Sequence, residues 1–200
     1  MRTMPRTDED APLVAAARSG DRRSFETLVR RHARAAARLA NRLLGNREDA
    51  EDVVQEAFAK AYQKLDAFRG DASFRTWVSH ITMHLCHDRL RVRQRRGAMV
   101  ALDGVDPVPD PTAGGAAPER HAEARDDLAL LRRAVDDLPP RQKSALVLKV
   151  YEGLPYDEVA KALGTTVASA RVYLSLARQS IRRRLERAER RGSGAEEDAS

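Results

Sequence analysis

Two arginine-rich segments are the residues best suited to chemistry in this sequence, and that chemistry is the binding of phosphates. The segment 88–96 reads DRLRVRQRR, with five arginines and one aspartate. The segment 171–191 holds eight arginines against Glu186 and Glu189. Guanidinium groups bind phosphate oxygens with paired hydrogen bonds, so both segments indicate contact with a polyanion such as nucleic acid.

A third charged segment, 47–56, is acidic and suited to contact with another protein. It reads REDAEDVVQE, with five acidic residues and one arginine. The positive end of a helix dipole favours acidic residues in the first turn, which explains Glu48 and Asp49 but not residues a full turn later. The residues that recur at helical spacing on or beside one face are Asp49, Asp52, Gln55 and Glu56.

Three histidines and the single cysteine form the remaining group of reactive side chains. His80, His84 and His87 stand at i, i+4 and i+7, with Cys86 between them. A histidine pair at i, i+4 can bind zinc, but no clear fourth ligand follows. We therefore expect polar contacts or core edges for the histidines, a small buried hydrophobe for Cys86, and no metal or cofactor.

Composition narrows the class of protein. The 200 residues are 33% charged and 4% aromatic, with a net charge of +6. Abundant Ala, Leu, Arg and Glu with few aromatics favours an all-α fold. One cysteine excludes an internal disulfide, and no apolar run approaches the roughly 18–20 residues of a membrane span. We expect a cytoplasmic protein with no secretory signal and no membrane insertion.

A stretch rich in proline and glycine divides the chain. Residues 97–118 contain four of the nine prolines and four of the eleven glycines. Such a composition cannot hold a helix or bury much apolar surface. The expected organisation is two small helical domains joined by a flexible linker: an N-terminal domain at 1–96, the linker at 97–121, a C-terminal domain at 122–191, and a disordered acidic tail at 192–200.

Apolar residues at helical spacing run through both domains. In the first, stripes predict a short helix ending near Gly20, a three-to-four-helix bundle continuing over 25–44, 50–65 and 74–85, and a loop at 66–73. In the second, they predict helices over 128–138, from Pro139-Pro140 to Gly153, and over 156–163. Gly164 then opens a turn, and Thr166 is a suitable N-cap for a longer basic helix. This order is typical of a helix-turn-helix.

The two domains together resemble a known family. The run NREDAEDVVQEAFAKAYQKLDAFRGDASFRTWVSHIT, followed by a basic DRLR, resembles region 2 of bacterial extracytoplasmic-function (ECF) sigma factors. The run LPPRQKSALVLKVYEGLPYDEVAKALGTTVASARVYLSLARQSIRRRL resembles their region 4. The resemblance covers about residues 9–96 and 122–187.

The resemblance assigns roles in the first domain. The acidic helix would dock on core RNA polymerase, at the clamp helices of the β′ subunit, through the four residues named above. The loop and the helix after it would recognise and melt the promoter −10 element, because unstacked bases need aromatic and cationic side chains to hold them. We read Phe74 and Trp77 chiefly as core and favour function for Phe68 and Arg69. The −10 candidates are Phe68, Arg69, Ser73, Arg75, Trp77, His80, His84 and Arg91.

In the second domain, the resemblance places the last helix in the major groove of the −35 element, with the β flap of polymerase as a further contact. A core stripe is expected at Ala170, Leu174, Ala177, Ile181 and Leu185. The groove candidates are Ser169, Arg171, Val172, Ser175, Leu176 and Arg178. The family often has Gly-Thr-Val-Lys-Ser-Arg-Leu where this chain has ASARVYL, and Leu176 stands where arginine is frequent, so the −35 sequence is left open.

The expected function is that of a non-enzymatic sigma factor that binds core RNA polymerase and promoter DNA and is controlled by an anti-sigma factor. The alternative is a stand-alone helix-turn-helix transcriptional regulator, which has no need for the acidic helix or the FRGDASFRTW loop. A nucleic-acid enzyme would need acidic residues around a metal, for which the sequence offers only Asp49, Asp52 and Glu56. No Walker-type glycine loop or nucleophile elbow is present.

Overall fold

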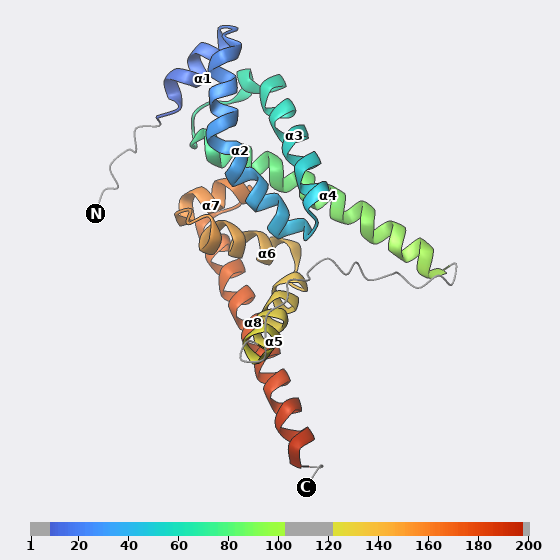
Figure 1. Ribbon diagram of the computed structural model, residues 1–200. Helices are drawn as coiled ribbons and strands as arrows, with labels where there is room; N and C mark the ends of the chain where they lie inside the picture. The colour runs from blue at the N-terminus through green and yellow to red at the C-terminus, as the bar shows by residue number, and fades with distance from the viewer. Residues whose placement is uncertain (1–8, 103–121, 198–200) are drawn as a thin grey trace, which may run out of the picture.

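A computed structural model describes residues 9–102 and 122–197, and every regular element in these ranges is helical (Figure 1). The all-α prediction is therefore confirmed. The N-terminal domain comprises α1 (Ala11–Arg18), α2 (Arg22–Leu44), α3 (Arg47–Gln63), a 3-10 turn (Leu65–Ala67) and α4 (Phe74–Leu102). The C-terminal domain comprises α5 (Ala122–Asp136), α6 (Pro140–Leu146), a π turn (Val147–Tyr151), α7 (Tyr156–Leu163) and α8 (Val167–Glu197).

Local capping interactions set the helix boundaries of the N-terminal domain. The Asp21 side chain accepts a hydrogen bond from the backbone N–H of Arg23 and begins α2. Gly45 ends α2 in the left-handed conformation with φ 71°, which a residue with a side chain adopts only at a cost. The Asn46 side chain then caps α3. These adjacent stop and start signals fold α2 back against α3.

The C-terminal domain contains the expected helix-turn-helix. Gly164 ends α7 with φ 60°, and the Thr166 hydroxyl accepts a hydrogen bond from the backbone N–H of Ser169 at 3.1 Å to begin α8. Before α7, the π turn continues α6 through a bond from the N–H of Glu152 to the carbonyl of Val147. The wider turn places Glu152 at the end of the helix.

Two helices run past the boundaries expected from sequence. The first, α4, continues to Leu102, because Ala98, Met99 and Leu102 favour helix and the next proline along the chain is Pro107. The second, α8, continues to Glu197, so residues 192–197 are helical rather than disordered; no proline interrupts them. Residues 103–121 of the expected linker lie outside the described ranges.

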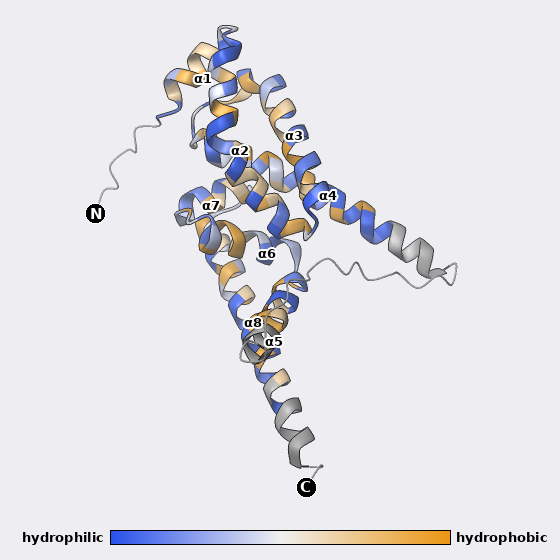
Figure 2. Ribbon diagram, viewed as in Figure 1, coloured by the Kyte–Doolittle hydropathy of each residue, from blue (hydrophilic) through white to orange (hydrophobic). Residues whose placement is uncertain are grey.

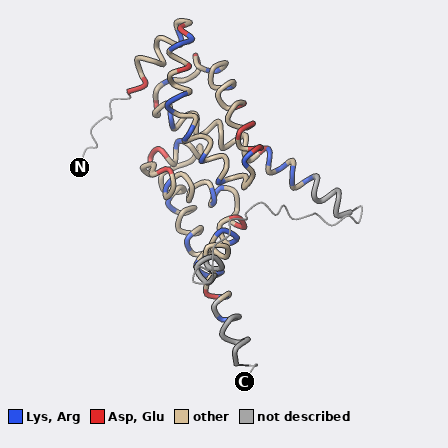
Figure 3. The backbone as a smooth tube through the Cα atoms, in the orientation of Figure 1, with Lys and Arg blue, Asp and Glu red and all other residues tan. Residues whose placement is uncertain are grey.

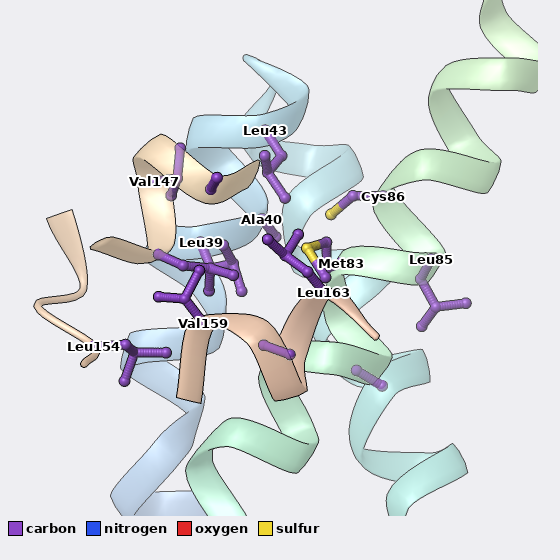
Figure 4. Packing of buried hydrophobic residues seen from close by; sticks show 14 of the residues in the cluster. Leu39, Ala40, Leu43, Met83, Leu85, Cys86, Val147, Leu154, Val159 and Leu163 are labelled. Carbon is purple, nitrogen blue, oxygen red and sulfur yellow. The ribbon is translucent and has the colours of Figure 1, made fainter. Parts of the chain in front are cut away.

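The two domains pack directly against each other, which the sequence did not predict. One apolar cluster contains residues of α2, α3 and α4 together with residues of the π turn, α7 and α8. Figure 4 shows Leu39 and Leu43 of α2, Met83 of α4, and Val159 and Leu163 of α7 pointing into this cluster. As far as its residues are described, the part of α4 that projects beyond the bundle is rich in polar residues (Figure 2). The close packing buries apolar surface and so stabilises the contact between the domains.

The N-terminal domain has a second apolar cluster of its own beneath α1 and the 66–73 loop. Its fully or nearly fully buried members include Leu28, Phe58, Phe74 and Val78. This cluster lies outside the contact between domains, so the N-terminal bundle has a core that does not depend on the C-terminal domain. None of the described helices is both long and apolar enough to cross a membrane.

Candidate protein and nucleic-acid interfaces

The acidic segment forms an exposed face of α3, which we call the acidic face: Asp49, Asp52, Gln55 and Glu56. Asp52, Gln55 and Glu56 are exposed and Asp49 is half-buried. The Arg89 guanidinium of α4 lies 3.2 Å from the Asp49 carboxylate and 3.8 Å from that of Asp52. Figure 3 shows acidic residues of α3 close to the basic stretch of α4. The structure thus brings the four predicted residues together, still open to a partner.

The arginines that follow His87 differ in their partners, although the sequence predicted one shared role in phosphate binding. Arg89, which the sequence placed with the phosphate-binding arginines, pairs instead with the acidic face. Arg91 lies 2.6 Å from Asp88, one turn away on α4, and both side chains are exposed. Arg93 and Arg95 are also exposed. These arginines can therefore still supply cations, with Arg89 already holding a carboxylate.

The loop before α4 differs from its expected arrangement at Phe68. The sequence favoured an accessible ring for base contact, but Phe68 is only 6% exposed. Its ring packs edge-on against Phe74 with centroids 6.0 Å apart and lies 5.0 Å from the Trp77 ring. Trp77 is half-buried in the same group, as a core role requires. Arg69 is exposed and pairs with Asp71 at 3.2 Å.

Three candidates on or just before α4 contact the C-terminal domain; we call Ser73, Arg75 and His80 the α4 face. Arg75 donates hydrogen bonds of 3.0 Å to the carboxylate and the backbone carbonyl of Glu152. The Nδ1 of His80 lies 2.7 Å from the Ala162 carbonyl and donates to it. Ser73 lies at hydrogen-bonding distance from Glu158. The structure therefore brings these residues together beneath the C-terminal domain.

The histidines are engaged separately rather than around a common point. The His84 ring lies 4.3 Å from that of His80. His84 is exposed over much of its surface, and the partial burial of its ring, together with the charge of His80, lowers its pKa. His87 shares a 2.9 Å hydrogen bond with the Ser144 hydroxyl of α6. Burial raises the pKa of the Cys86 thiol to about 12. In the described ranges, no group of three or more His, Cys, Asp and Glu residues is arranged to hold a metal.

The groove candidates of the C-terminal domain lie on the outer side of α8, and we call them the α8 face. Of the predicted core stripe, Ala170, Leu174 and Ala177 are buried against the domain, whereas Ile181 and Leu185 further along α8 are half-buried. The candidates that are exposed are Arg171, Val172, Ser175, Leu176 and Arg178, and Ser169 is half-buried. Two of them, Val172 and Leu176, are apolar side chains 53% and 41% exposed, which suits contact with a partner or with thymine methyl groups.

Sequence reasoning missed the residues that join the domains. Glu152 has a side chain only 3% exposed, and arginines of α2 and α4 surround it. Lys143 donates to the Leu43 carbonyl of α2 at 3.1 Å and to Asp136 at 2.9 Å. In the sequence, Glu152 stands out only because it comes directly before Gly153, where a helix was expected to end. That position does not indicate which residues its carboxylate contacts.

A two-domain helical protein with a helix-turn-helix, an exposed recognition helix and a separate acidic face belongs to the class of DNA-binding transcription proteins. Residues 28–96 match the family Sigma-70 region 2, and residues 128–181 match Sigma-70, region 4. The RNA polymerase sigma-H factor of Pseudomonas aeruginosa is 32% identical over 193 residues, covering 90% of this chain and 95% of that protein. The ECF RNA polymerase sigma-E factor of Escherichia coli K12 is 32% identical over 177 residues, covering 86% and 92%. The chain therefore belongs to the ECF sigma factors of the sigma-70 family.

Solved structures agree with this assignment. CnrH, solved in complex with the cytosolic domain of CnrY, superposes with a TM-score of 0.65 at 27% identity, covering 88% of this chain and 97% of that one. The sigma factor RpoE of Bartonella quintana, co-crystallised with the anti-sigma factor NepR, shares the fold with a TM-score of 0.60 at 24% identity, covering 81% and 96%. The sequence-based recognition of a sigma factor is confirmed, and the stand-alone regulator is not favoured.

Proposed function

We propose that this chain binds core RNA polymerase through the acidic face of α3 and directs it to promoters in the cytoplasm without catalysing a reaction itself. The loop before α4 and α4 would contact the −10 element, and α8 would contact the −35 element. The observation that supports this most strongly is that the acidic face and the α8 face lie on different domains and are both exposed. A protein that bridges polymerase and DNA needs two such surfaces.

The geometry of α8 supports major-groove contact. Its first four turns carry Arg171, Ser175 and Arg178 on the exposed side, while the Thr166 cap fixes where the helix begins. Recognition helices contact base edges with their N-terminal residues and phosphates with flanking cations. The Arg171 guanidinium lies over the Tyr156 ring, 5.2 Å from its centroid, which restricts where this side chain can point.

The proposed docking at the β′ clamp helices is supported by charge and exposure. Among the described residues, the carboxylates of the acidic face pair with the partly exposed cations Arg89 and Lys60. Such surface pairs contribute little, about 0–1 kcal/mol, so a partner can displace them. We further propose regulation by an anti-sigma factor, which family membership supports; CnrH, of similar fold, was solved with another protein bound.

In vitro transcription with core polymerase on a genomic fragment library tests the function directly. We expect transcripts from defined start sites only when both core polymerase and the chain are present. A stand-alone regulator would instead bind duplex promoter DNA tightly without core enzyme and yield no new transcripts. Capture of core enzyme by Asp52→Ala and Gln55→Ala chains should fall, whereas Glu51→Ala, an exposed acid of α3 that pairs with Arg47, is the matched control.

A further inference from the structure

One carboxylate of the C-terminal domain is bound by three arginines of the N-terminal domain. The Glu152 carboxylate lies 3.0 Å from Arg75, 3.2 Å from Arg38 and 3.5 Å from Arg42. Its side chain is 3% exposed, while those of the arginines are 35–46% exposed. Several guanidinium groups converging on one anion is also the arrangement that binds a DNA phosphate. Glu152 therefore occupies a place suited to phosphate.

Two further acceptors of the C-terminal domain, the Glu158 carboxylate and the Ala162 carbonyl, bind polar side chains of α4 next to Arg75. The Thr76 hydroxyl donates to Glu158 of α7 at 2.7 Å, and the Ser73 hydroxyl lies 2.8 Å from that of Thr76 and 3.5 Å from the Glu158 carboxylate. One turn further along α4, His80 donates to the Ala162 carbonyl. An added Cβ on Gly164, in the turn of the helix-turn-helix, would lie 3.9 Å from the His80 ring. The polar groups of the α4 face are thus hydrogen-bonded to the C-terminal domain over successive turns.

Apolar packing continues the same contact toward the centre of the molecule. Val159 of α7 is 1% exposed and Leu163 is 9% exposed, and both belong to the cluster that includes Leu39 and Met83 of the N-terminal domain. Cys86 of α4 is fully buried in this cluster (Figure 4). The contact therefore combines a buried apolar centre with a polar rim, as specific protein interfaces do.

We infer that the C-terminal domain is an intramolecular partner of the α4 face, and that the chain has a closed form in which this domain and −10 DNA exclude each other. The DNA part of this inference rests on the proposed function. The carboxylates of Glu152 and Glu158 take up the donors that phosphates or bases would use, so −10 recognition requires the domains to separate. The α8 face and the acidic face stay exposed in the closed form.

The rim of the contact favours reversibility. The three arginines keep about a third or more of their surface in water, so they regain hydration readily when Glu152 leaves. In the sequence, 19 residues stand between Leu102 and Ala122, and a fully extended chain of 19 residues spans at most roughly 65 Å. Separation therefore requires breaking the contact but no unfolding of either domain.

The single cysteine allows the closed form to be tested in the full chain. The Cys86 thiol is 0% exposed and its pKa is raised to about 12, so a disulfide reagent such as dithiobis(nitrobenzoate) reaches it only on opening. Glu152→Gln preserves size and removes the charge that the arginines bind. We expect Cys86 to react about tenfold faster in this variant, as loss of a charge-assisted contact predicts. Glu186→Gln, on an exposed pair within α8, should leave the rate unchanged.

The same proteins are then titrated with fluorescent single-stranded DNA of random sequence, and circular dichroism checks that helix content is retained. Glu152→Gln should bind this DNA several-fold more tightly than the wild type and Glu186→Gln. Equal Cys86 rates in wild type and Glu152→Gln overturn the closed form. A faster rate without tighter DNA binding overturns the competition with DNA. Absence of core-dependent transcripts from the wild type would overturn the proposed function alone, because the Cys86 rate does not depend on it.

Discussion

The α4 face and the α8 face each combine arginine with serine, yet only the α8 face is open to solvent. Arg75 and His80 of the α4 face are bonded to Glu152 and Ala162 of the other domain. Arg171 and Arg178 of the α8 face are exposed. The difference arises from which carboxylates lie nearby in space. Arginine content therefore identifies a surface that can bind phosphates, while packing decides whether it is available.

The two faces also differ in how they relate to the core. On α8, the exposed side lies opposite the buried stripe of Ala170, Leu174 and Ala177, as in a helix with one apolar face. On α4, both sides are engaged: Phe74 and Val78 pack into the N-terminal bundle, and the opposite side meets α7. A helix between two packed layers has little free surface until one layer moves away.

The largest expected effect comes from reversing the charge of the central carboxylate. Glu152→Arg places a fourth guanidinium among Arg38, Arg42 and Arg75, so the contact between domains should lose about 3–5 kcal/mol, as for disruption of a buried ion pair. Small-angle scattering should show a larger radius of gyration than for the wild type, with helix content retained. Glu186→Arg is the matched control and should scatter like the wild type. If Glu152→Arg scatters like the wild type, Glu152 does not hold the C-terminal domain against the α4 face.

Phe68→Ala tests whether the loop before α4 is built around a buried ring. Phe68 is 6% exposed between Phe74 and Trp77, so truncation should destabilise the chain by about 3 kcal/mol through lost burial and a cavity. Urea denaturation followed by circular dichroism measures the change. Arg69→Ala, an exposed neighbour in the loop, should cost little stability. If Phe68→Ala keeps full stability and loses only −10 activity, the ring contacts DNA instead.

Arg75→Ala and Arg171→Ala form a pair that separates the two faces. Arg75→Ala removes both a bond to Glu152 and a proposed DNA contact, so Cys86 should react faster while −10 DNA binding weakens. Arg171→Ala should weaken −35 binding by about 1–3 kcal/mol and leave the Cys86 rate unchanged. Duplex and single-stranded DNA titrations with holoenzyme measure the binding. A change of the Cys86 rate in Arg171→Ala would show that the faces are coupled.

The smallest expected effect is a pH dependence through His87. Burial, more than its charged neighbours, lowers the pKa of His87 from its ordinary value of 6.5, because the ring bonded to Ser144 lies between the domains. The packed state thus favours the neutral His87 ring over the protonated one. The contribution of this ring to the stability of the packed state is therefore complete above pH 6.5 and decreases as the pH falls below that value. The neighbouring charged groups are His84, Asp88, Arg91 and Arg141.

Cys86 reactivity, corrected for the thiolate fraction of a free cysteine, should therefore rise modestly relative to neutral pH when the pH falls to about 5.5. His87→Gln keeps a hydrogen-bonding group toward Ser144 and should flatten this dependence. His84 is exposed and its pKa is also lowered, so a His84→Gln control separates the two histidines. If the pH dependence of the Cys86 rate is the same in His87→Gln as in the wild type, a group other than His87 causes it.

Features encoded by neighbouring residues could be predicted from the sequence. Gly45, Gly164 and Thr166 act within one turn of chain, so the helix ends and the helix-turn-helix followed from local signals. The stripe of α8 fixed its exposed side. The partners of Glu152 and Arg89 could not be predicted, because they join residues 114 and 40 positions apart through packing alone. The burial of Phe68 could not be predicted either, because its position in a loop indicated exposure and only tertiary packing buries the ring.

The distance between the domains in the free chain tests the central claim most directly. Spin labels on Lys64→Cys and Asp157→Cys, both exposed positions, in a Cys86→Ala background would report it by pulsed electron spin resonance. We predict one narrow distance distribution for this chain, and a broad distribution at longer distances when Glu152→Arg is added. A broad distribution without Glu152→Arg would contradict the account, because the α4 face would then be as open as the α8 face.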